Sequence, residues 1–61
     1  MIEYCVVARC RDNLGKTITV IRTEESDDAS FAKRCVADDL ARDGLEVISI
    51  SASRMSGGNN E

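Results

Sequence analysis

The chain has 61 residues, three cysteines, no histidine and a formal net charge of −3 at pH 7. An odd number of cysteines without a CxxC pair argues against a disulfide framework, and the absence of histidine argues against a tetrahedral metal site. We therefore expect no cofactor, free thiols in a reducing, cytoplasmic setting and no membrane contact, because no apolar stretch is long enough to cross a bilayer.

The small size of the chain limits its stability. A domain of about this length buries only about 60% of the surface that its unfolded chain exposes. Small domains compensate with disulfides, a bound metal or association, and the composition disfavours the first two. Association with a second copy or with another protein is therefore the expected source of additional stability.

Residues 2–11 and 17–23 predict a β-hairpin. Both segments are rich in β-branched residues, and the first carries apolar residues on both faces, as a central strand does. Between them, Asp12-Asn13-Leu14-Gly15-Lys16 predicts a type I turn closed by Gly15 in the left-handed region, and this turn fixes the strand register. The expected cross-strand pairs are Cys10 with Ile18, Ala8 with Val20, and Val7 with Ile21.

Residues 27–43 predict an amphipathic helix that follows an acidic linker at 24–28. Ser26 or Asp27 is the expected N-cap, and Gly44 is placed as the left-handed residue that follows the last turn. The apolar positions fall on one side of the helix. These positions are Ala29, Ala32, Cys35, Val36 and Leu40, with Phe31 at the edge.

Residues 45–53 predict a third strand with strict alternation between its two faces. Ile48, Ile50 and Ala52 are expected to face the helix, and Val47, Ser49 and Ser51 to face away from it. Residues 55–61 have no apolar periodicity and are expected to form a flexible tail after a single domain at 1–54.

The ββαβ order predicts an α+β fold, with a three-stranded antiparallel sheet in the spatial order 2-1-3 and the helix on one face. The first strand is placed in the centre because both of its faces are apolar. In the alternative topology the third strand lies beside the second in a parallel crossover, which leaves the apolar first strand at an edge.

One helix covers only one face of such a sheet, so the other face is expected to bind a partner. Homodimerisation through this face, or docking of a different protein on it, is the primary functional prediction. The expected interface residues are Cys5, Val7, Arg9, Ile21 and Val47.

Nucleic-acid binding is the alternative function, because basic side chains are predicted on the sheet side. The negative net charge opposes this function. The shortage of aromatic stacking residues also opposes it, since both Tyr4 and Phe31 are expected in the core. The basic residues concerned are Arg9, Arg11, Lys16 and Arg22.

The helical segment is acidic: residues 23–46 hold eight acidic and three basic side chains. Such a segment could present negative charge to a basic partner. The residues expected on this acidic surface are Glu24, Glu25, Asp27, Asp28 and Asp38.

Catalysis and a small-molecule substrate are not expected. The sequence has no histidine to act as a general base and no glycine-rich phosphate loop, and Cys10 is predicted to be buried. A very small non-enzymatic protein suits an accessory or inhibitory role, of the kind that phages and mobile elements often encode.

Overall fold

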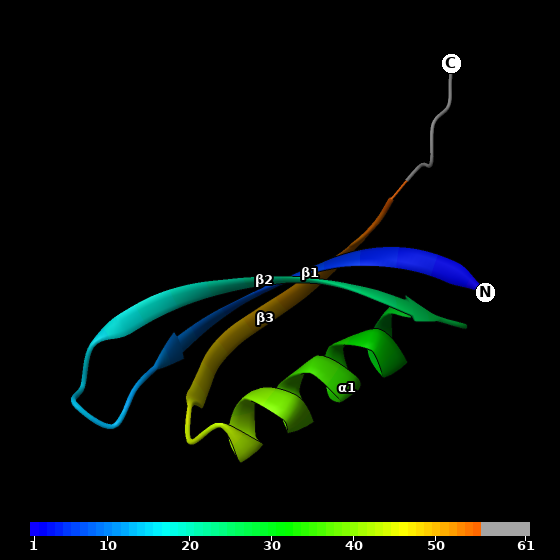
Figure 1. The fold of residues 1–61 in the computed structure, drawn as a ribbon. Helices are drawn as coiled ribbons and strands as arrows, with labels where there is room; N and C mark the ends of the chain where they lie inside the picture. Colours follow the sequence, from blue (N-terminus) through cyan, green and yellow to red (C-terminus); the bar gives the residue numbers. More distant parts are fainter. Residues whose placement is uncertain (56–61) are drawn as a thin grey trace.

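The computed structural model describes residues 1–55, which form one sheet with one helix packed on one of its faces (Figure 1). The elements are β1 (Ile2–Arg11), β2 (Thr17–Ser26), α1 (Ala29–Arg42) and β3 (Glu46–Arg54). The sheet order is β2-β1-β3, and β1 pairs antiparallel with both neighbours. The predicted α+β fold and the predicted strand order are therefore confirmed. Of the tail expected at 55–61, residues 56–61 lie outside the described residues.

The predicted hairpin turn is confirmed in its hydrogen bonds. The Asp12 carboxylate accepts from the backbone N–H groups of Leu14 (2.9 Å) and Lys16 (2.8 Å). Gly15 has φ = +83°, in the left-handed region that a glycine adopts without a steric cost. The turn produces the expected register: Cys10 pairs with Ile18, Ala8 with Val20 and Val7 with Ile21.

Strand β2 is longer than the sequence suggested, and the predicted linker at 24–28 is wrong in its first half. Glu24, Glu25 and Ser26 continue the strand opposite Tyr4, Glu3 and Ile2. The beginning of β1 has backbone groups that need partners on this side, and an edge strand tolerates glutamates because one of its sides is open to water.

The helix consequently begins later than predicted. Its N-cap is Asp28, whose carboxylate accepts from the Phe31 backbone N–H at 2.8 Å, rather than Ser26 or Asp27. Its end is as predicted: Gly44 has φ = +85° and donates to the Ala41 carbonyl, and Leu45 donates to the Leu40 carbonyl. This pair of hydrogen bonds is the Schellman motif, which stops the helix and turns the chain towards β3.

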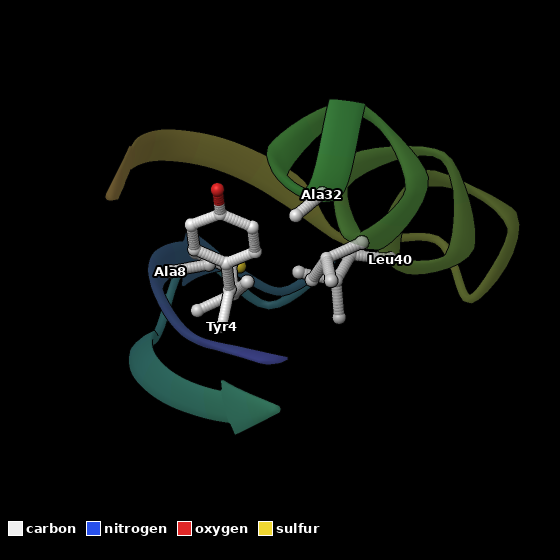
Figure 2. Close-up of a cluster of buried hydrophobic side chains, with 7 residues drawn as sticks. Tyr4, Ala8, Ala32 and Leu40 are labelled. Carbon is white, nitrogen blue, oxygen red and sulfur yellow. The ribbon is translucent and has the colours of Figure 1, made fainter. Parts of the chain in front are cut away.

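The core lies between α1 and the covered face of the sheet (Figure 2). Alternate residues of β1 meet one side of the helix, as the two periodicities predict. Phe31 is not part of this core: its side chain is 56% exposed, so the edge of the predicted apolar side faces water. The buried apolar residues are Tyr4, Val6, Ala8, Cys10, Ala32, Val36 and Leu40.

A β-bulge in β3 reverses two predicted orientations. Arg9 pairs with Ser49 but Cys10 pairs with Val47, so Ile48 is an extra residue opposite the Arg9–Cys10 step. Val47 therefore packs against the core, whereas Ile48 is 49% exposed. Strict alternation predicted the opposite for both residues. The bulge lets both Val47 and Ile50 contact the core from one strand.

Ser26 is 2% exposed, and its hydroxyl oxygen has no hydrogen-bond partner. A buried hydroxyl without a partner loses its hydration and gains nothing in return, at a cost of about 1–3 kcal/mol. We expect Ser26→Ala to raise the free energy of unfolding by about 1 kcal/mol. Urea denaturation monitored by circular dichroism measures this free energy. The control is Ser53→Ala, at an exposed strand position, which should change the free energy of unfolding little. A clear loss of stability in Ser26→Ala would contradict the prediction.

The left-handed conformation of Gly44 should be the main reason for glycine at this position. A Cβ added there meets nothing within 4 Å, so only the backbone conformation opposes a side chain. We expect Gly44→Ala to lower the free energy of unfolding by about 1 kcal/mol, and Gly44→Asn to cost less because asparagine tolerates this conformation. Equal losses in the two variants, measured by thermal denaturation, would show that another contact matters more.

Candidate protein-interaction surface

We use the name open face for the side of the sheet opposite α1, where no element of the described chain covers the strands (Figure 1). Cross-strand partners point to the same side of a sheet, so the register assigns the members of this face. They are Glu3, Cys5, Val7, Arg9 and Arg11 on β1, Thr17, Thr19, Ile21, Thr23 and Glu25 on β2, and Glu46, Ser49, Ser51 and Ser53 on β3.

The centre of the open face is apolar, and most of the neighbouring side chains on β2 and β3 are threonines and serines. Val7 lies between Ile21 on β2 and Ser51 on β3, and it is half-buried by these neighbours. Ile21 is 66% exposed, although its side chain is large and apolar. With Cys5 beside Val7 on the central strand, these residues form a small apolar cluster between the threonines of β2 and the serines of β3.

Four of the five predicted interface residues are brought together on the open face: Cys5, Val7, Arg9 and Ile21. The fifth, Val47, is a correction. The bulge in β3 turns Val47 towards the helix, where it packs against the core. Val47 is thus lost from the predicted interface, whereas its neighbour Ile48, which was expected to face the helix, is 49% exposed.

The charges of the open face are separated along β1. Glu3 lies at one end of the strand, opposite Glu25 of β2. Arg9 and Arg11 lie at the other end. Glu46 also lies at this end, opposite Arg11, and the sequence did not predict this position because it depends on the bulge. The face is therefore acidic at one end and carries two arginines and one glutamate at the other.

The four basic residues predicted for nucleic acid do not share one surface. Arg9 and Arg11 are on the open face, whereas Arg22 pairs with the buried Val6 and thus lies on the helix side of the sheet. Lys16 belongs to the turn, where its backbone pairs with Asp12. Two arginines, rather than four cations, remain for any ligand of the open face.

The predicted acidic surface is also divided. Glu24 pairs with Tyr4 on the helix side, whereas Glu25 pairs with Glu3 on the open face. Asp27 and Asp28 lie between β2 and α1, where Asp28 is occupied as the helix cap, and Asp38 is exposed on the helix. The sheet therefore separates Glu25 from Glu24.

Phe31 is a surface residue that sequence reasoning placed at the edge of the core. A shallow cavity of about 170 Å³ lies at this point, lined by Asp28, Ser30, Phe31 and Arg34. The exposure of Phe31 could have been predicted, because on a helical wheel it lies outside the stripe formed by Ala32, Val36 and Leu40.

The described residues offer little for other chemistry. Among residues 1–55, no three cysteine, aspartate or glutamate side chains come together in a way that could hold a metal ion. The one helix of this part of the chain lacks the length and the apolar character needed to span a membrane. The thiols differ in access: Cys10 is fully buried, and Cys5 and Cys35 are half-buried.

Comparisons with protein-family models, with curated proteins and with solved structures return no match.

The burial of Cys10 predicts a difference in thiol reactivity. In the native protein we expect iodoacetamide to modify Cys5 and Cys35 first, and Cys10 at least about 100-fold more slowly, because Cys10 reacts only when the core opens. Peptide mass spectrometry over a time course measures the three rates. In urea the rates should become similar. Equal rates in the native protein would contradict the packing of Cys10.

Proposed function

We propose that this protein is a protein-interaction module that associates with a second copy of itself through the open face. The observation that carries this proposal is the exposed Ile21 beside Val7 in the middle of an uncovered sheet. Water contact with this cluster is unfavourable, and a second sheet face packed on it removes that contact. An isologous dimer also adds stability to so small a domain at protein concentrations above its dissociation constant.

The dimensions of the open face favour a weak, reversible dimer. Three strands about 4.8 Å apart, with an 8-residue span that rises about 3.3 Å per residue, give a footprint of roughly 400 Å² per copy. A standard protein interface buries about 800 Å² per partner. Association in the micromolar range or weaker is therefore expected, and measurements need to extend to high protein concentration.

The surroundings of the cluster suit a protein surface better than a nucleic acid. Serine and threonine side chains are short and uncharged, so they let two sheets approach closely. A nucleic-acid site depends mainly on cations that contact phosphates, and only Arg9 and Arg11 are on this face. Nucleic-acid binding through these two arginines is the weaker alternative.

The setting we propose is an accessory or inhibitory protein in a reducing compartment such as the cytoplasm. The free thiols of Cys5, Cys10 and Cys35 suit this environment. The sequence has no histidine for acid–base catalysis. A non-enzymatic role through binding fits these properties.

Ile21→Glu tests the proposed function. The side chain is 66% exposed, so the substitution should leave the fold intact while placing a charge in the proposed interface. We expect sedimentation equilibrium to show a dimer constant weakened at least about tenfold, because the glutamate loses hydration on association. The matched control is Arg22→Glu, the next residue on the same strand but on the helix side, which should leave the dimer unchanged.

Alkylation of Cys5 gives a second measurement on the unmodified sequence. Its rate should fall as protein concentration rises, because the second copy covers the open face, while the rate for Cys35 on the helix stays constant. A protein that sediments as a monomer up to millimolar concentration, with a constant Cys5 rate, would overturn the proposed dimer. Salt-sensitive retention on a nucleic-acid column would then favour the alternative.

A further inference from the structure

The distribution of charge on the open face points to one arrangement of the proposed dimer: we infer that two copies stack face to face with their β1 strands antiparallel, each Arg11 lying over Glu3 of the second copy. This inference rests on the proposed function, since it specifies the partner's orientation at the same face. It adds that the face is complementary to itself only in this orientation.

Strand β1 carries the pattern on which the inference depends. Its five open-face positions, in order, are Glu3, Cys5, Val7, Arg9 and Arg11. Val7 is the middle position and also belongs to the apolar cluster with Ile21. The other four positions form two pairs placed symmetrically about Val7: an inner pair, Cys5 and Arg9, and an outer pair, Glu3 and Arg11. The outer pair has opposite charges.

Two symmetric face-to-face arrangements keep the strands of both sheets nearly aligned. In the first, the two-fold axis runs across the strands at the level of Val7, so β1 of one copy lies antiparallel on β1 of the other. Val7 then meets Val7 of the second copy, Ile21 meets Ile21 of the second copy, and Arg11 meets Glu3 of the second copy. The apolar clusters coincide and opposite charges face each other twice.

In the second arrangement the two-fold axis runs along β1, so each residue of this strand faces its own counterpart. Arg9 and Arg11 would then meet the same arginines of the second copy, and Glu3 would meet a glutamate. Like charges placed opposite each other between two sheets are strongly unfavourable because the interface excludes water. The charges on β1 therefore select the first arrangement.

The edge strands are compatible with the first arrangement. Glu25 is opposite Glu3, so an arginine displaced towards β2 by the sheet twist still meets a carboxylate. Met55 lies at the level of Glu3, since its backbone N–H donates to the Glu3 carbonyl at 2.9 Å. Glu46, at the level of Arg11, therefore faces Met55 of the second copy rather than another acid.

Charge exchange on β1 tests this orientation. Both Glu3 and Arg11 are exposed, so their substitution should leave the fold intact. We expect Glu3→Arg alone and Arg11→Glu alone each to weaken the dimer about tenfold in sedimentation equilibrium, because each creates two like-charge contacts. The double variant E3R/R11E restores both contacts and should dimerise within about threefold of the original protein. The matched controls, Arg22→Glu and Asp38→Arg, lie off the open face and should have no effect.

A mixing experiment separates the two orientations. In the antiparallel arrangement, the original protein and the E3R/R11E variant repel each other at both ends, so a mixture should contain the two homodimers and few mixed dimers. In the other arrangement, the same mixture would form mixed dimers preferentially. Native mass spectrometry of the mixture, with the variant labelled with nitrogen-15, counts the three species.

The outcomes distinguish this inference from the proposed function. A dimer of the original protein that mixes freely with E3R/R11E, or prefers it, overturns the antiparallel orientation but leaves dimerisation through the open face intact. Single charge variants that dimerise as well as the original protein also overturn the orientation. A monomeric original protein would overturn both. Self-sorting into homodimers, with rescue in the double variant, would support the inference.

Discussion

The central position of β1 is the constraint on which the rest of the structure depends. It is the only strand in the described chain with a partner on both sides, and its alternating side chains define both faces of the sheet. The even-numbered residues from Tyr4 to Cys10 enter the core under α1. The odd-numbered residues from Glu3 to Arg11 form the middle row of the open face. One strand thus determines both the stability of the domain and the character of its exposed surface.

This dependence explains why the fold has one covered face and one open face. Helix α1 presents a narrow apolar stripe, in which Ala32, Val36 and Leu40 are buried. A stripe of this width covers a single face of a three-stranded sheet. The open face keeps Val7 and Ile21 in contact with water, although serine and threonine rows beside them limit the apolar area. The association that we propose through this face would bury the small apolar area between these rows.

The elements that local chemistry specifies were predictable from the sequence. Asp12 and Gly15 predicted the turn, and with it the register of β1 against β2, because a short hairpin loop allows one pairing. Gly44 and Leu45 predicted the end of the helix for the same reason. In each case a few neighbouring residues decide the conformation through hydrogen bonds within the segment.

The features that tertiary contacts decide were not predictable in this way. The helix start moved to Asp28 because β1 needs partners along its whole length, which extends β2 to Ser26. The orientation of Val47 depends on a bulge that brings it opposite Cys10. The alternation of side chains along β3 does not indicate this bulge, because the bulge depends on the pairing with β1. The open face was therefore predicted correctly on β1 and β2 and at Ser49 and Ser51 of β3, whereas Val47 was wrong and Glu46 was not predicted.

The bulge at Ile48 has a consequence for how this surface can change over generations. Because Ile48 is an extra residue, its deletion would make Val47 and Ser49 neighbours and restore a regular ladder, with Val47 still opposite Cys10 and Glu46 still opposite Arg11. A chain without Ile48 would thus lose one exposed apolar side chain and keep the Glu46 carboxylate beside Arg11. The third strand can therefore lose this residue while the charged end of the open face stays as it is.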